Sequence, residues 1–80
     1  MAEGAVLLDV RSPQEFAGSH LPEAVNIPVN QLDAHLDEVR RFNRPVVVYC
    51  ASGMRSNRAT GILRSAEIQD VHDLGSLSRW

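Results

Sequence analysis

The chain has 80 residues, of which 44% are hydrophobic and 22% are charged, and its formal net charge is -2. This is the composition of an ordinary globular protein, and the length suffices for one small domain, so we expect a single domain over residues 1–80. The small net charge argues against a nucleic-acid partner, and no apolar run approaches the ~18 residues of a membrane-spanning helix.

The cysteine and lysine content excludes an internal disulfide and one class of catalysis. Cys50 is the only cysteine, so the chain cannot form an internal disulfide, and a reducing compartment is the default. The first residues contain no basic segment followed by a long apolar one, which favours a cytoplasmic location, although a mature form that has lost a signal peptide would look the same. All eight basic residues are arginine, which excludes Schiff-base catalysis by lysine.

The first predicted strand is the apolar run over residues 5–10, and a helix is expected directly after it. Ser12, Pro13 and Glu15 would occupy the N-cap, N1 and N3 positions of that helix, which is a capping box with proline where its missing N–H costs nothing. Capping is a sufficient role for Glu15, and an ion pair with Arg11 is a second expectation for its carboxylate.

A short strand over residues 24–27 is expected before the clearest helix of the sequence. Asn30 is the predicted N-cap of this helix, and arginines near its C-terminal end suit the helix dipole. Apolar residues recur at the spacing of helical turns at Leu32, Leu36 and Val39.

The most β-prone run is residues 46–49, which shows no polar alternation and is therefore expected in the middle of a parallel sheet. An amphipathic helix is predicted from about Arg55, and a last strand over residues 70–73. Strands that alternate with helices predict an α/β fold, with a small, mostly parallel sheet flanked by helices. Ligands of such sheets bind outside the carboxyl ends of the strands, where Cys50 lies.

The segment after Cys50 combines small residues with positive charge. Residues 51–53 lead into a helix N-terminus, so successive backbone N–H groups are expected to point at the sulfur and stabilise a thiolate. Arg55 adds a guanidinium that no carboxylate close in sequence opposes, since residues 44–66 contain no Asp or Glu. Both features lower the pKa of the thiol and attract an anionic substrate to the same place.

Weaker expectations concern the neighbourhood of this thiol. Arg58 lies one turn beyond Arg55 and is a candidate for steering anions, although a solvated surface role is simpler.

Cys50 itself has a simpler interpretation as a small apolar residue that closes a core strand, and a sulfur sealed in the interior would favour that interpretation. No metal site is expected, because no ligand motif has the spacing of the three histidines, His20, His35 and His72.

Three segments of the sequence resemble rhodanese-type sulfurtransferase domains. Residues 7–28 read LLDVRSPQEFAGSHLPEAVNIP, similar to the family's opening DVR strand followed by E-F/Y and G-H-I-x-G-A-x-N-I-P. Residues 46–56, VVVYCASGMRS, resemble the active-site strand and loop, and residues 71–80, VHDLGSLSRW, resemble the closing V-x-x-L-x-G-G-x-x-x-W. The resemblance implies a rhodanese-like three-layer α/β fold in a minimal version, without the family's first strand and last helix.

The resemblance also implies roles for individual residues. Cys50 matches the persulfide-forming cysteine of the family, and Asp9 and Arg11 match its D-x-R, for which an ion pair or loop-bracing hydrogen bonds is the simpler interpretation. Trp80 is expected to cover the core near the site. The residues of the loop and its flank, which would contact the substrate, are Ala51, Ser52, Gly53, Met54, Arg55 and Ser56.

The family's reaction is a double displacement that needs no metal or organic cofactor. The cysteine thiolate attacks the outer sulfur of a donor such as thiosulfate, sulfite leaves, and the persulfide passes its sulfur to cyanide, a thiol or a protein acceptor. A monomer is expected. The resemblance thus implies a sulfurtransferase of the thiosulfate:cyanide type, with small anionic donors as partners.

Three alternatives remain open at this point, one of which, a persulfide carrier whose donor and acceptor are both proteins, differs in partner and not in chemistry. Another is a rhodanese-like module without catalytic activity that serves in binding or regulation, although such modules usually lose the cysteine. The last is a cysteine-based phosphatase or arsenate reductase on the same fold, which would use C-x5-R to enclose an oxyanion. This chain has C-x4-R from Cys50 to Arg55, and the arginine of a longer loop would fall at Ser56.

Overall fold

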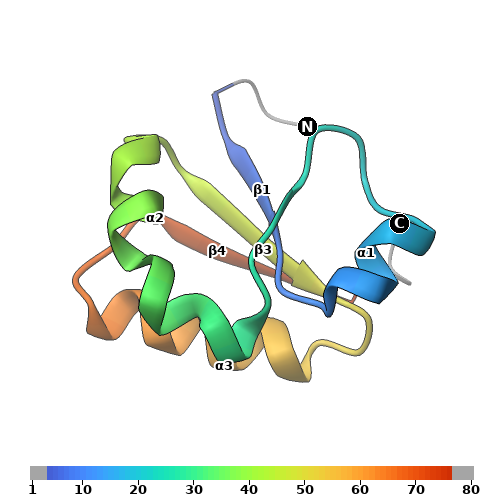
Figure 1. Cartoon of the computed structure of the whole chain (residues 1–80). Helices are drawn as coiled ribbons and strands as arrows, with labels where there is room; N and C mark the ends of the chain where they lie inside the picture. Colours follow the sequence, from blue (N-terminus) through green and yellow to red (C-terminus); the bar gives the residue numbers. More distant parts are fainter. Residues whose placement is uncertain (1–3, 77–80) are drawn as a thin grey trace.

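The computed structural model describes residues 4–76, and within this range strands and helices alternate as the sequence predicts. Figure 1 shows the strands at the centre of the molecule with the helices around them. In chain order the elements are β1 (Val6–Asp9), α1 (Pro13–Gly18), β2 (Val25–Asn26), the 3₁₀ helix η1 (Val29–His35), α2 (Leu36–Phe42), β3 (Val46–Cys50), α3 (Met54–Ser65) and β4 (Val71–Ser76).

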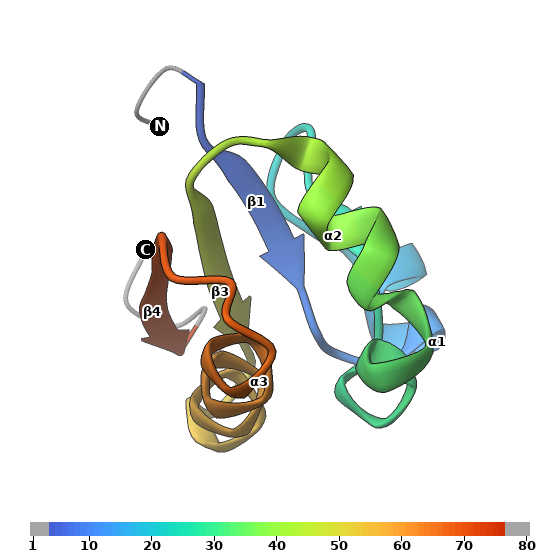
Figure 2. The same ribbon diagram turned by 90° about the vertical axis from the view of Figure 1, so that its left-hand side faces the viewer.

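The described strands form one parallel sheet in the order β2-β1-β3-β4. β3 is an interior strand, paired with β1 on one side and β4 on the other, which confirms the position predicted for residues 46–49. Parallel strands bring their carboxyl ends to one edge of the sheet. Both α1 and the loop that follows β3 lie at this edge (Figures 1 and 2).

The start of α1 is fixed by the capping box that the sequence predicts. The backbone N–H of Glu15 donates to Ser12 Oγ at 3.2 Å, and the backbone N–H of Ser12 donates to Glu15 Oε1 at 3.0 Å. Pro13 occupies the first turn, where the helix requires no donor. The Glu15 side chain is thereby held at the edge of the sheet where the strands end.

The segment predicted to be one helix with Asn30 as its N-cap differs from that prediction in two ways. The prediction of Asn30 as the cap is wrong, because Pro28 takes the N-cap position and no side chain caps the segment. The chain then makes the tighter turns of η1, and regular α-helix begins only at α2. Val29 and Leu32 explain the tighter turns, since residues three apart lie on the same side of a 3₁₀ helix and both are buried here.

The last strand is longer than the predicted residues 70–73. β4 runs through Ser76, because a register shift between Val48 and Tyr49 of β3 allows Gly75 to pair with Tyr49. Gly75 has a φ of 86°, a conformation that favours glycine, and it lies at the irregularity in the strand pairing. Glycine usually indicates a turn in a sequence, but here it is part of the strand. Trp80 lies outside the described residues.

The main hydrophobic core lies between the sheet and the helices η1, α2 and α3 (Figure 2). Alternate residues of β3 point into it, in keeping with the period of two in a strand. Its buried members are Leu8, Val10, Ile27, Val29, Leu32, Val39, Val46, Val48, Cys50, Ala59, Leu63 and Val71. The prediction of a buried parallel sheet is therefore confirmed, and Cys50 is part of this core.

The segment between α1 and β2 covers part of the opposite face of the sheet. Tyr49 points to this face, is fully buried, and accepts a hydrogen bond at its hydroxyl from the Leu21 N–H at 3.2 Å. Burial raises the pKa of Tyr49, and the Leu21 hydrogen bond opposes that rise. None of the helices in the described range is long and apolar enough to cross a membrane.

Candidate functional site

Cys50 is the last residue of β3, and the loop of residues 51–53 carries the chain from it to the N-terminus of α3. β3 is an interior strand of the sheet, and Cys50 at its end pairs with Ser76 of β4, which fixes the backbone that carries the sulfur. The sulfur therefore lies at the carboxyl edge of the sheet, as the sequence predicts, directly beneath the loop.

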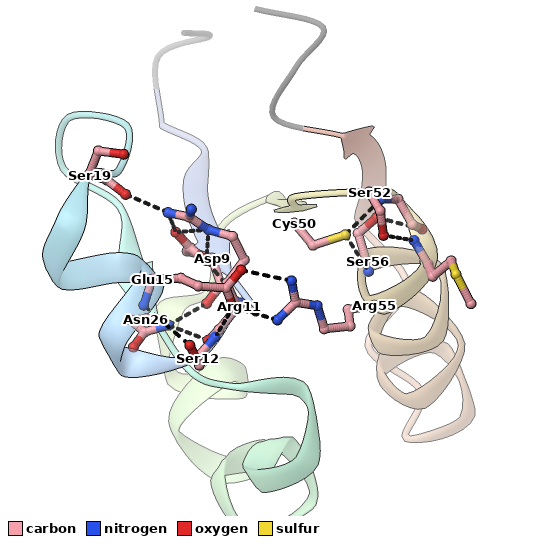
Figure 3. Close-up of polar contacts among 12 residues, drawn as sticks. Asp9, Arg11, Ser12, Glu15, Ser19, Asn26, Cys50, Ser52, Arg55 and Ser56 are labelled. Carbon is pink, nitrogen blue, oxygen red and sulfur yellow. Dashed lines mark hydrogen bonds and ion pairs between the residues drawn. The ribbon is translucent and has the colours of Figure 1, made fainter.

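Backbone N–H groups of the loop and helix converge on the Cys50 sulfur (Figure 3). The Gly53 N–H donates to Sγ at 2.9 Å and the Ser56 N–H donates to it at 3.2 Å. Gly53 adopts a φ of 96°, in the left-handed region where a side chain would strain the backbone. The glycine thus permits the turn that points these amides inward, and the nest of donors predicted from the sequence is present.

The electrostatic consequence is a lowered pKa for the Cys50 thiol. Burial by itself raises the pKa, but hydrogen bonds from the Ser56 hydroxyl and from the backbone N–H groups of Ser56, Gly53 and Ser52 outweigh it. These donors stabilise the thiolate more than the thiol, because a hydrogen bond to a charged acceptor is stronger than one to a neutral acceptor. A cysteine in a purely apolar core would lack them.

The Ser56 hydroxyl has alternative acceptors within reach. Its Oγ donates to the Gly53 carbonyl at 3.1 Å and lies 3.5 Å from that of Gly75. A hydroxyl carries one hydrogen and rotates to suit its acceptor, so it can bond a carbonyl while Cys50 is protonated and turn to the sulfur when the thiolate forms. Ser56 is fully buried, which excludes water from this exchange.

The loop is also fastened to the end of β4. Ser76 Oγ donates to the Ala51 carbonyl at 2.6 Å, which fixes the first loop residue against the neighbouring strand. Within the loop, the Met54 N–H lies 3.5 Å from Ser52 Oγ. These contacts hold the loop residues over the sulfur even though Ala51 and Ser52 are exposed.

The Cys50 side chain is closed off from solvent in this conformation. Cys50 has 0% relative exposure and belongs to the core cluster, as the structural interpretation of the cysteine predicts. Its amide donors, however, come from a surface loop and not from the core. A reagent can reach the sulfur only if this loop or the cysteine side chain moves.

No carboxylate close in sequence opposes Arg55, but the tertiary structure brings one to it from a distant part of the chain. Its NH1 and NH2 donate to Glu15 Oε1 and Oε2 at 2.6 and 3.0 Å (Figure 3). The predicted pair between Glu15 and Arg11 is wrong for the same reason. The hydrogen bond from Arg55 is the main cause that lowers the pKa of Glu15 from 4.5 to about 2, and the pair in turn raises the pKa of Arg55.

The Glu15–Arg55 pair connects the capping box of α1 to the first turn of α3. Glu15 Oε1 accepts from both the Ser12 N–H and the Arg55 guanidinium. Arg55 directly precedes Ser56, whose N–H bonds the sulfur, so the pair restrains the chain where the sulfur donors lie. The partners are forty positions apart, so no local sequence signal predicts this contact.

Asp9 and Arg11 form a buried ion pair, which confirms the simpler interpretation of these two residues. The Asp9 carboxylate accepts from Arg11 Nε and NH2 at 2.8 to 3.1 Å, and also from the Arg11 backbone N–H. Arg11 NH2 donates further to the Ser19 carbonyl at 2.6 Å, and its guanidinium lies 5.9 Å from the centre of the Tyr49 ring. The pair braces the chain between β1 and α1, and hydrogen bonding to Asp9 raises the pKa of Arg11.

Asn26 is a bracing residue that the sequence prediction missed. Its side-chain Nδ2 donates to the Asp9 and Arg11 carbonyls at 3.0 Å each, which ties the end of β2 to the turn after β1. The sequence does show an amide side chain, Asn26, at the end of a short apolar strand. Such a side chain can donate to a backbone carbonyl of the neighbouring strand, and this signal could have predicted its role.

The remaining predicted residues lie on the exposed side of α3. Met54 is 79% exposed and Arg58 is exposed, so the structure brings neither into contact with the sulfur. Within residues 4–76, no three His, Cys, Asp or Glu side chains are grouped so that they could hold a metal ion. The site is thus a thiol bonded by backbone amides, with an ion pair and an exposed helix face beside it.

The sequence pattern of the rhodanese-like domain family matches residues 1–80. The chain belongs to this family. Among curated proteins, this rhodanese-like domain is 40% identical over 77 residues to the uncharacterized protein YqhL of Bacillus subtilis, covering 95% of the chain and 60% of that protein. It is 33% identical over 79 residues to the thiosulfate sulfurtransferase GlpE of Pseudomonas syringae, covering 98% of the chain and 74% of that protein.

Solved structures share the fold of this rhodanese-like domain. The human single-domain sulfurtransferase TSTD1 superimposes with a TM-score of 0.82 at 30% identity, over 96% of this chain and 80% of that one. The small parallel sheet with flanking helices is therefore the rhodanese fold. The chain spans 60% or less of several curated relatives, including 44% of a protein of Synechocystis.

Proposed function

We propose that this rhodanese-like domain is a sulfurtransferase that carries sulfane sulfur as a persulfide on Cys50. In the first step the thiolate attacks the outer sulfur of thiosulfate, a sulfur–sulfur bond to Cys50 forms, and the bond to the sulfonate breaks with its electron pair leaving on sulfite. In the second step cyanide or a thiolate attacks the outer persulfide sulfur, and the Cys50 thiolate is released. Charge and atoms balance in each step without an oxidant or reductant.

The observation that carries the proposal is the set of hydrogen bonds to the Cys50 sulfur. Donors at 2.9 and 3.2 Å, together with the Ser56 hydroxyl, lower the pKa of the thiol and so increase the fraction present as the nucleophilic thiolate. The same donors suit the negative outer sulfur of the persulfide, since they are fixed backbone groups that need little reorganisation. No general acid is required, because sulfite and the thiolate both leave as anions.

The length of the loop favours a single sulfur over a phosphate group. Arg55 closes a C-x4-R segment that is one residue shorter than the C-x5-R loop used to enclose a phosphate group, and its guanidinium is bonded to Glu15 at 2.6 and 3.0 Å. Ser56 stands where the arginine of a loop one residue longer would be, and its hydroxyl bonds the Gly53 carbonyl. These contacts support sulfur transfer over phosphate or arsenate chemistry.

Thiosulfate as donor and cyanide, a thiol or a protein as acceptor are the finer part of the proposal. A relative named thiosulfate sulfurtransferase and a structural neighbour named single-domain sulfurtransferase support it. The buried sulfur adds one requirement, which is that the loop of residues 51–53 moves aside or the Cys50 side chain rotates during each transfer. The exposed Ala51 and Ser52 form the part of the loop that has least packing to lose.

The decisive experiment measures intact mass after incubation with thiosulfate. We expect the chain to gain one sulfur atom, to lose it on addition of cyanide with formation of thiocyanate, and to gain none as the Cys50→Ser variant. No sulfur adduct together with hydrolysis of an aryl phosphate would favour the phosphatase alternative. No adduct and no hydrolysis would leave a binding module.

A further inference from the structure

One large apolar side chain stands out on the described surface. Met54 is 79% exposed, whereas every other large hydrophobic residue among residues 4–76 is at least partly buried. It follows Gly53, whose N–H bonds the Cys50 sulfur, and it is the first residue of α3. Methionine is flexible and polarizable and is common at adaptable binding surfaces, so Met54 is a candidate contact for a partner that approaches the thiol.

Met54 begins an exposed line of residues along α3. Arg58 and Gly61 follow it at the i+4 and i+7 positions, which lie on one face of an α-helix. All three are exposed, and the opposite face of the helix carries the buried residues Ser56, Ala59, Thr60 and Leu63. We call Met54, Arg58 and Gly61 the outer stripe of α3. In Figure 2 no other element covers the side of α3 that is turned away from the sheet.

The charge of the outer stripe is positive and unneutralised. Arg58 makes no hydrogen bond or ion pair with another of the described residues, and residues 44–66 contain no Asp or Glu. Glu15, which the fold brings to this region, is bonded by both oxygens to Arg55. Within residues 4–76, no carboxylate therefore neutralises Arg58.

Gly61 is unexplained by the fold. It lies within α3 in ordinary helical conformation, and a Cβ added there would meet no atom within 4 Å. Glycine inside a helix costs up to about 1 kcal/mol relative to alanine. A bare backbone on an exposed face does, however, allow a second surface to approach closely.

We propose that the outer stripe of α3 docks an acidic protein that accepts the sulfur from Cys50. The inference rests on the proposed function, and it specifies the acceptor as a protein thiol with an apolar residue and carboxylates nearby. The stripe extends about 10 Å along the helix, from the 1.5 Å rise of each residue, which is far longer than cyanide or a small inorganic ion. Met54 would contact the apolar residue next to the accepting thiol, and Arg58 the carboxylates.

The test uses two peptides as acceptors. Each has twelve residues, one cysteine and a leucine beside it, and the pair differs in carrying three glutamates or three lysines. Cys50 is loaded with sulfur from thiosulfate, excess donor is removed, and single-turnover transfer to each peptide is followed by mass. We expect the glutamate peptide to react about tenfold faster at low salt, with the preference shrinking as salt rises to ~1 M.

Three variants locate this preference on α3. Arg58→Glu should abolish or reverse it, and Met54→Ser should slow transfer to both peptides, which share the leucine, relative to transfer to cyanide. Arg41→Glu, at an exposed position on α2, is the matched charge control and should keep the preference within about twofold. For the two arginine variants the ratio of the two peptide rates is the readout, so a change in sulfur loading does not imitate the effect.

Two outcomes would contradict the docking proposal in different ways. If Cys50 takes up sulfur but both peptides react equally, or if Arg41→Glu changes the ratio as much as Arg58→Glu, the outer stripe is not the docking surface. If Cys50 takes up no sulfur from thiosulfate, the proposed function fails and the docking proposal fails with it.

Discussion

Replacement of Ser56 by alanine would remove a hydroxyl beside the Cys50 sulfur and leave both backbone donors in place. Ser56 is fully buried, and its hydroxyl is one of the groups that lower the pKa of Cys50. The backbone N–H groups of Gly53 and Ser56, at 2.9 and 3.2 Å, do not depend on the side chain. The variant should therefore raise the pKa of Cys50 without abolishing the nest.

The size of the effect follows from the hydrogen bonds exchanged. A hydrogen bond to a charged group contributes about 1.5–3 kcal/mol, whereas one between neutral groups contributes about 0.5–1.5 kcal/mol. In the wild type, the hydroxyl gives up its bond to the Gly53 carbonyl, 3.1 Å away, when it turns to the thiolate. The mid-points of these two ranges differ by about 1.25 kcal/mol, and a net loss of this size lowers the thiolate population about eightfold at any pH where the thiol predominates.

Ultraviolet absorbance of the thiolate, recorded against pH, measures this change without depending on access to the buried sulfur. The exposed Ser65 at the end of α3 provides the control, since Ser65→Ala makes the same chemical change away from the sulfur. We expect a higher midpoint for Ser56→Ala and an unchanged one for Ser65→Ala. Equal midpoints in all three proteins would refute the role assigned to the hydroxyl.

Stability against pH gives a second measurement of the same quantity. The folded state lowers the pKa of Cys50, so the thiolate contributes stability that is fully present above the unfolded pKa of about 8.5 and is lost as the pH falls through the folded pKa. The difference in urea stability between wild type and Ser56→Ala should therefore be larger at alkaline pH than near pH ~6.

Three further substitutions test the surroundings of the site. Glu15→Gln removes the carboxylate that pairs with Arg55. Because the pKa of Glu15 is about 2 instead of 4.5, the stability that this carboxylate contributes should be complete above pH 4.5 and lost as the pH falls toward 2. A difference in Tm between wild type and variant that is equal at both pH values would contradict this expectation. Asp9→Asn leaves Arg11 buried without its counter-ion and should cost about 3–5 kcal/mol in urea unfolding, with a loss below ~1 kcal/mol showing that the pair is dispensable. Leu63→Ala should cost about 2–5 kcal/mol in the same assay, because Leu63 is fully buried in the core, and near-wild-type stability would contradict that packing.

Local sequence signals predicted most of the fold and the position of the thiol. Ser12, Pro13 and Glu15 form the expected capping box, and the apolar run before Cys50 is the expected interior strand. Such features depend on neighbours within a few residues, so the sequence contains them directly. The prediction of Asn30 as an N-cap was wrong because the chain turns at Pro28 and continues as a 3₁₀ helix that buries nearby apolar side chains. This burial outweighs the local preference of Asn30 for the N-cap position.

The sequence by itself determined that one thiol follows a buried strand and precedes a glycine-containing turn into a helix, and these residues are enough to predict amides directed at the sulfur. Only the tertiary structure decided that Glu15 neutralises Arg55, that Asn26 braces the turn after β1, and that the loop closes over the sulfur. These contacts join residues separated by fifteen to forty positions. Such pairs are set by the register of a parallel sheet and the packing of helices on it, and no local pattern encodes them.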